Sequence, residues 1–127
     1  MSMKYISIEK APKAVGPYSQ AIVSNGFIHC SGQIGIDPKT NELVSGFEEQ
    51  TRQVLKNLSE VLKAGNSGLD KVIKTTVYLA HIKDYGTMNE IYGEYFSKHK
   101  PARAAFAVSH LPKDALIEIE VIAEATK

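Results

Sequence analysis

Residues 101–123, PARAAFAVSHLPKDALIEIEVIA, are the stretch of sequence that decides the fold. A run of small and apolar residues at Arg103–Val108 leads into a polar loop, which predicts a strand followed by a turn. Ile117–Ala123 then alternates apolar and acidic side chains, the pattern of a half-buried strand. Because side chains alternate across a strand, Glu118 and Glu120 project from one face. The isoleucine and valine side chains between them project from the opposite face, which is expected to be buried.

The two strands predict a site if they pair as an antiparallel hairpin. In that arrangement the two carboxylates lie opposite the segment that contains Arg103, Ala105 and Ala107. A cation and two carboxylates then share one face beside small side chains, which provides an anchor for an anion and a candidate general base. The same pattern also fits an ordinary half-solvated strand whose Arg–Glu pairs are surface ion pairs. Spacing alone leaves both interpretations open.

Upstream of this stretch, a turn signal and a change of period predict a hairpin and a helix. Ser24-Asn25-Gly26 separates the apolar runs Ala21–Val23 and Phe27–Ser31, and Asn-Gly between two such runs is typical of a β-hairpin. From Gly46 to Ala64 the apolar residues fall three or four apart, which predicts an amphipathic helix. Gly65 stands where such a helix is expected to end.

The rest of the chain completes one domain over residues 1–127. Leu69–Leu79 is rich in β-branched and aromatic residues and predicts a strand. Apolar spacing predicts a second helix from about Asp84 to Lys98, which must end before Pro101. The expected order is hairpin, helix, strand, helix, hairpin, so the fold class is α+β: a two-layer sandwich of a mixed β-sheet with two helices on one face. No helix remains for the other sheet face, which predicts that a second subunit covers it.

Composition excludes several classes of protein. Fifteen basic and fourteen acidic residues give a net charge of +1, unlike a dedicated nucleic-acid binder, which gathers a basic excess on one face. The single cysteine, Cys30, excludes an internal disulfide and lies in an apolar run, where a thiol is usually a small buried hydrophobe. No metal site is predicted, because the histidines are dispersed, at positions 29, 81, 99 and 110. The absence of a bilayer-length apolar stretch or signal-peptide core predicts no membrane association and a cytoplasmic location.

Four further residues are weaker candidates. Tyr18 lies in the Gly16–Gln20 loop, where it either faces a ligand or packs on the core. Ser31 and Gly32 lie at the end of a predicted strand, and a glycine there permits close approach of a ligand or a simple bulge. Asn89, on the second predicted helix, fits a solvated position at least as well as a ligand contact.

Taken together, the segments resemble the Rid (YjgF-like, reactive intermediate deaminase) family over essentially the whole chain. The resemblance is carried by four stretches in order: APKAVGPYSQA, SGQIGIDPKTNEL, VIKTTVYLAHIKDYGTMNEIY, and PARAAFAV with LPKDALIEIEVIA. The last is the most specific, because proline and arginine enter a strand and Leu-Pro-Lys-Asp then precedes Ile-Glu-Ile-Glu.

The resemblance implies a chorismate-mutase-like fold assembled as a homotrimer with clefts between neighbouring subunits. It also implies hydrolysis of reactive 2-enamines and 2-imines, such as 2-aminoacrylate, to 2-keto acids and ammonia, without a metal or cofactor. In this role Arg103 would clamp the substrate carboxylate and Glu118 would position or activate water. The cleft would be lined by four further residues: Tyr18, Ser31, Gly32 and Asn89.

The chain departs from the family pattern at Ala105, where many members carry a cysteine whose backbone supplies the substrate contact. The choice of Glu118 over Glu120 also rests on the resemblance alone, because both carboxylates share a face. Two other functions stay open. One is a non-enzymatic trimer that binds small 2-keto acids as a sensor or chaperone. The other is an endoribonuclease or translation inhibitor, which the near-neutral charge and the lack of paired aromatic RNA-binding motifs disfavour.

Overall fold

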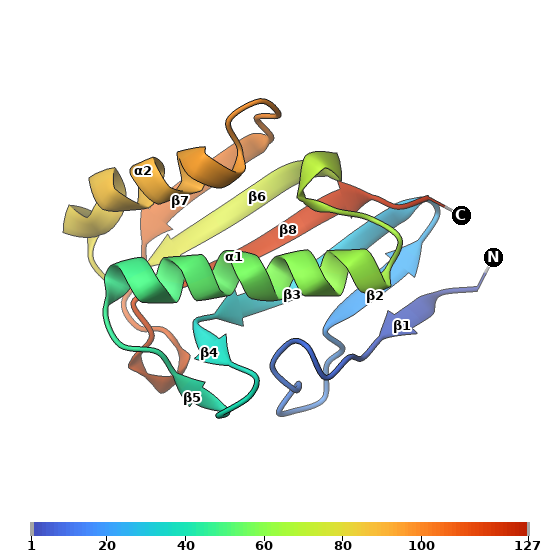
Figure 1. Cartoon of the computed structure of the whole chain (residues 1–127), viewed down its shortest axis with the longest axis horizontal. Helices are drawn as coiled ribbons and strands as arrows, with labels where there is room; N and C mark the ends of the chain where they lie inside the picture. Colours follow the sequence, from blue (N-terminus) through green and yellow to red (C-terminus); the bar gives the residue numbers. More distant parts are fainter. Residues whose placement is uncertain (1, 127) are drawn as a thin grey trace.

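The computed structural model describes residues 2–126 as one sheet layer and one helix layer (Figure 1). The main sheet has six strands: β1 (Lys4–Ile6), β2 (Ala21–Ser24), β3 (Phe27–Ile34), β6 (Val72–Leu79), β7 (Ala102–Ala107) and β8 (Ile117–Glu124). A separate small hairpin is formed by β4 (Ile36–Asp37) and β5 (Glu42–Leu43). The helices are α1 (Phe47–Ala64) and α2 (Tyr85–Tyr95). Short 3₁₀ turns lie at Leu69–Lys71, Ile82–Asp84 and Pro112–Asp114.

The strand order is β1-β2-β3-β8-β6-β7, with β6 and β7 parallel and all other neighbours antiparallel. Both helices lie on the same face of this sheet, α1 across its middle and α2 over β6 and β7 (Figure 1). The prediction of an α+β fold with two helices and a mixed sheet is therefore confirmed. Within the described residues, no helix is long and apolar enough to cross a membrane.

The first hairpin forms where the sequence predicts it. Asn25 and Gly26 have φ values of 52° and 82°, the left-handed pair that a two-residue hairpin turn requires, and they join β2 to β3. The first helix also ends as predicted, but the left-handed residue is Asn66, with φ 59°, rather than Gly65, with φ −99°. Gly65 gives room for a neighbouring side chain: a Cβ there would lie 2.5 Å from the Cδ1 atom of Ile28, so that buried isoleucine would have to move.

The core lies between α1 and the central strands. The apolar stripe of α1 is fully buried, and it packs with inward-facing residues of β6 and β8; this part of the core consists of Val54, Leu55, Leu58, Val61, Leu62, Val77, Leu79, Ile117, Ile119, Val121 and Ala123. The alternating sequence of the last strand thus buries the predicted face.

Two element boundaries differ from the predictions. The strand expected at Leu69–Leu79 begins at Val72, because the first three residues form a 3₁₀ turn. The second helix, expected to reach Lys98, ends at Tyr95. Phe96 is the last buried residue of its stripe, and the four residues after it are exposed, so another helical turn would bury no apolar surface.

The predicted C-terminal hairpin is wrong. β7 pairs in parallel with β6 at the edge of the sheet, whereas β8 lies between β3 and β6. The helix α2 connects β6 to β7, and parallel neighbours require such a crossover. The alternating strand β8 pairs with β3 and β6 on both edges and takes the central position.

The sheet face opposite the helices, here called the open face, is covered by no helix of the described chain (Figure 1). Several of its apolar residues remain exposed or half-buried: Tyr5, Ile22, Phe27, Tyr78, Phe106 and Ile122. The open face also carries Glu118 and Glu120.

Candidate active site

Four of the predicted site residues line one pocket of about 430 Å³: Tyr18, Ser31, Gly32 and Glu118. These four residues are called the Glu118 group. They come from the loop before β2, the end of β3 and the start of β8, and the turn at Pro112 and Lys113 closes one side. Segments distant in the sequence thus meet at a single hollow.

The Glu118 carboxylate occupies space that Gly32 leaves free. The pairing of β3 with β8 is interrupted by a bulge between Cys30 and Gln33, which contains Gly32. A Cβ atom at Gly32 would lie 2.0 Å from Oε2 of Glu118, closer than any contact allows. A glycine here is therefore required for the observed position of the carboxylate.

Glu118 and Glu120 differ in their hydrogen bonds. The Tyr78 hydroxyl donates to Oε1 of Glu120 at 2.9 Å, and Glu120 is exposed. Glu118 is half-buried, and its pKa is raised, first by burial and second by the negative charge of Glu120. Within residues 2–126 no side chain donates a hydrogen bond to Glu118. This carboxylate is therefore free to accept a proton from a bound water.

The loop that carries Tyr18 is held by Gln20, a residue that sequence reasoning did not identify. The Gln20 side chain is buried, accepts a hydrogen bond from the backbone of Ile8 at 2.7 Å and donates one to the Pro12 carbonyl at 2.8 Å. Ser31 donates to the Ser19 carbonyl at 2.6 Å, which fixes the loop to β3. Tyr18 itself is exposed, so the fold holds its backbone and leaves its ring accessible.

Arg103 lies on the opposite side of the sheet from the Glu118 carboxylate. Arg103 is paired with Thr75, which is also paired with the inward-facing Val121, so its side chain points toward the helix layer. Its Nη2 atom donates to the Tyr85 hydroxyl at 3.0 Å, and its guanidinium lies 4.8 Å from the centroid of the Tyr92 ring. The expectation that one chain places arginine and both glutamates on a shared face is wrong, because the hairpin on which it depended does not form.

Asn89 and Ala105 lie on the Arg103 side. Asn89 is half-buried on α2 and follows Met88, whose sulfur contacts the guanidinium. Ala105 is two residues beyond Arg103 on β7 and packs against the core. These three residues, Arg103, Asn89 and Ala105, are called the Arg103 group. The residues of the sequence-predicted site thus form two groups on opposite sides of the main sheet.

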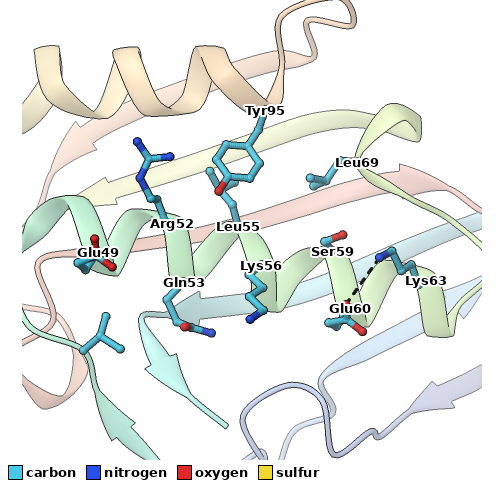
Figure 2. Close-up of a pocket in the computed structure, with 11 residues that line it drawn as sticks. Glu49, Arg52, Gln53, Leu55, Lys56, Ser59, Glu60, Lys63, Leu69 and Tyr95 are labelled. Carbon is cyan, nitrogen blue, oxygen red and sulfur yellow. Dashed lines mark ion pairs between the residues drawn. The ribbon is translucent and has the colours of Figure 1, made fainter. Parts of the chain in front are cut away.

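Three other features were candidates for a functional site: a pocket outside α1, a metal-binding cluster and the single cysteine. A pocket of about 340 Å³ lies along the outside of α1 and contains none of the predicted site residues (Figure 2). Among residues 2–126, no group of three or more His, Cys, Asp or Glu side chains is placed to hold a metal ion. Cys30 is buried, and burial raises the pKa of its thiol to about 12, so it remains a protonated core residue as expected.

Comparison with known proteins places the chain in a family. Residues 8–125 match the family model described as Endoribonuclease L-PSP. The chain belongs to this family. Two L-PSP relatives are a RutC family protein of Pyrococcus horikoshii and the human 2-iminobutanoate/2-iminopropanoate deaminase. The first is 56% identical over 93% of this chain and 94% of that protein, and the second is 52% identical over 94% and 88%.

The fold of this L-PSP protein is also that of solved structures. Escherichia coli TdcF, solved with bound serine, superposes with a TM-score of 0.92 at 35% identity, covering 97% of this chain and 99% of that chain. The deaminase relatives confirm the Rid resemblance that the four sequence stretches indicated.

Proposed function

We propose that this protein is an enzyme that hydrolyses 2-enamines and 2-imines to 2-keto acids and ammonia in the cytoplasm. The name of the human relative, at 52% identity over 94% of this chain, supports both the reaction type and the substrate class. The neighbouring structure with bound serine supports a site suited to a small 2-amino acid skeleton, the size of 2-aminoacrylate.

The observation that carries the proposal is the division of the site between two faces. Arg103 points to the helix layer and Glu118 to the open face, so the two cannot meet across one chain. Each would instead face the complementary group of another copy. We therefore propose a homotrimer in which the Arg103 group of one protomer and the Glu118 group of its neighbour enclose each cleft. The uncovered apolar residues of the open face support burial by a second copy.

The chemistry follows from the two charged groups. A guanidinium binds a carboxylate through two parallel charge-assisted hydrogen bonds, so Arg103 would hold the substrate's carboxylate and orient its imine carbon. Glu118 would take a proton from water as the water oxygen bonds to that carbon. That proton would pass to the imine nitrogen to give a carbinolamine. Glu118 would then carry the proton of the new hydroxyl group to the nitrogen as the C–N bond breaks, which leaves a 2-keto acid and ammonia. No cofactor is needed for this sequence of proton transfers.

The remaining residues would shape the cleft. Tyr18 would line it from its anchored loop, and Ser31 and Gly32 would form the strand end beside the carboxylate. Asn89 would form part of the opposite wall. The backbone of Ala105 would contribute in place of the cysteine found in many family members, and the absence of a thiol removes any thiol-based modification at this position.

The direct test supplies 2-aminoacrylate from a serine dehydratase and follows the formation of pyruvate. Wild-type protein is expected to accelerate release of the keto acid, and Arg103→Ala is expected to lose most of that acceleration. Arg52→Ala is the matched control. Arg52 lies away from both groups, where its guanidinium forms an exposed ion pair of 2.8 Å with Glu94. Full activity in Arg103→Ala would refute the deaminase site described here.

The family description provides the competing function, an endoribonuclease. RNA cleavage that stays with the protein through purification and disappears in Arg103→Ala, without any turnover of 2-aminoacrylate, would favour it. Binding of a small 2-keto acid without turnover would instead favour a non-enzymatic binding protein.

A further inference from the structure

The guanidinium of Arg103 is held between aromatic side chains on α2. It lies 4.8 Å from the centroid of the Tyr92 ring and 5.6 Å from that of Tyr85, distances at which a cation is attracted to the face of a ring. The Tyr85 hydroxyl also accepts a hydrogen bond from Nη2 at 3.0 Å. Met88, between the two tyrosines on the same helix, contacts Nη1 through its sulfur at 3.8 Å.

Tyr92 is itself fixed from behind. Its hydroxyl shares a hydrogen bond of 2.8 Å with Thr75, whose side chain is fully buried on β6. Thr75 is also the residue paired with Arg103 between β6 and β7. The ring that faces the guanidinium is therefore tied to the strand beside the one that carries Arg103, and its orientation is determined by the sheet.

We propose that Tyr85 and Tyr92 are positioning residues that hold the Arg103 guanidinium in a fixed plane for carboxylate binding. This inference rests on the proposed function, because it assigns a role to the surroundings of the same arginine. Neither tyrosine would touch the reacting atoms. Their effect would be to fix the rotamer of a long, flexible side chain before the substrate arrives.

The donor count is compatible with this role. A guanidinium has five N–H donors, and the contacts with Tyr85 and Met88 use one each, which leaves three for a ligand. Both tyrosines are on α2, as are Met88 and Asn89. One helix would therefore orient the arginine and form part of the cleft wall.

The test compares four single variants: Tyr85→Phe, Tyr92→Leu, Tyr92→Phe and the control Tyr95→Phe. Tyr95 lies on the same helix but beside Arg52, in the groove outside α1 (Figure 2). Steady-state turnover of the imine gives KM and kcat, and competition by 2-ketobutyrate gives the affinity for a stable carboxylate. Tyr85→Phe is expected to raise KM and the 2-ketobutyrate inhibition constant about fivefold with kcat within about twofold, because the lost contact acts on carboxylate binding alone.

Tyr92→Leu is expected to show the same split, and Tyr92→Phe, which keeps the ring, is expected to retain most of the affinity. Tyr95→Phe is expected to match the wild type. If Tyr92→Leu does not fold, Tyr85→Phe still tests the positioning role. Tyr85 is partly exposed and loses only its hydroxyl group, so this variant is expected to fold. Unchanged KM and inhibition constants in Tyr85→Phe, with Arg103→Ala inactive, would overturn the positioning role but leave the proposed function intact. Full activity in Arg103→Ala would remove both.

Discussion

Glu118 and Glu120 are two residues apart on β8, yet their surroundings differ in burial and in hydrogen bonding. Glu120 accepts a hydrogen bond from Tyr78 on the exposed part of the open face. Glu118 is half-buried over Gly32 and has a raised pKa, caused first by burial and then by Glu120. A general base works best inside the cleft and with a pKa raised toward the working pH, and Glu118, which lines the pocket, is the one that meets both conditions.

The two glutamates can be separated by paired substitutions. Glu118→Gln is expected to lower kcat by roughly 10²–10⁴-fold, the usual contribution of a general acid or base. Glu120→Gln is expected to keep turnover close to wild type at neutral pH, because glutamine still accepts the Tyr78 hydrogen bond. The measurement is keto acid formation from 2-aminoacrylate. A large loss in Glu120→Gln with an active Glu118→Gln would reverse the assignment.

The raised pKa of Glu118 also determines how pH acts. The base works only when ionised, so kcat/KM is expected to fall as the pH falls through this pKa. Removal of the neighbouring charge in Glu120→Gln is expected to move that acid limb to lower pH. Because folding raises this pKa, protonated Glu118 favours the folded state and ionised Glu118 opposes it. The stability that the protonated form contributes is therefore lost as the pH rises through the folded-state pKa. Glu118→Gln should therefore unfold at neutral pH no more easily than the wild type, which chemical denaturation can check.

At the residue scale, local sequence patterns identified candidate residues but not how these residues are arranged. Local patterns identified Glu118, Gly32 and Ser31, and these three residues are close in space because β3 and β8 are neighbouring strands. The placement of Arg103 depended on strand order, which no local pattern records. Tyr85 and Tyr92 fall within the apolar spacing that predicts the second helix, and this spacing indicates a core position for both. Their hydroxyl groups, where phenylalanine would suffice for packing, were the available signal of a polar role.

At the scale of elements, the close approach of α1 to the sheet depends on Gly35. A Cβ atom at Gly35 would lie 2.7 Å from the Cα atom of Gln50. Gln50 is buried near the start of α1, where it accepts a hydrogen bond from the backbone of Leu116 at 2.8 Å and donates one to the Val44 carbonyl at 3.1 Å. The Gln50 side chain therefore joins α1 to the loop that precedes β8.

Gly35→Ala is expected to lower the free energy of unfolding by about 1–3 kcal/mol, because the added methyl group meets backbone that cannot move without breaking these bonds. Gly93→Ala is the matched control. Gly93 lies inside α2 with no atom within 4 Å of an added Cβ, so alanine there is expected to stabilise the protein by roughly 0.5–1 kcal/mol. Urea denaturation measures both, and equal effects of the two substitutions would contradict the proposed packing.

The elements themselves were predictable where the signal was local. The Asn25-Gly26 hairpin and the amphipathic α1 follow from turn chemistry and a period that one segment contains. The insertion of β8 between β3 and β6 was not predictable in this way, because a short loop makes β7 and β8 appear to be a hairpin. The crossover helix α2 was the competing signal, since a strand–helix–strand unit favours parallel neighbours.

At the scale of the whole molecule, the two groups of candidate residues lie on opposite sides of one chain. The Arg103 group lies with α2 on the helix side, and the Glu118 group opens near the uncovered sheet face. A ring of identical copies, in which each contributes a different surface to the two neighbours, would bring the two groups together and cover the open face. The expectation of a second subunit came from the same consideration at the level of sequence, because two helices suffice for only one face.

Subunit mixing tests this account most directly. Arg103→Ala and Glu118→Gln, each inactive alone, are unfolded together in equal amounts, refolded and assayed for keto acid formation from 2-aminoacrylate. If each cleft takes its arginine and its glutamate from different protomers, random assembly of a closed ring leaves about a quarter of the clefts intact, and about a quarter of wild-type activity should return. If the mixture remains as inactive as its components while refolded wild type recovers, the two residues act within one chain and the division of the site between protomers is wrong.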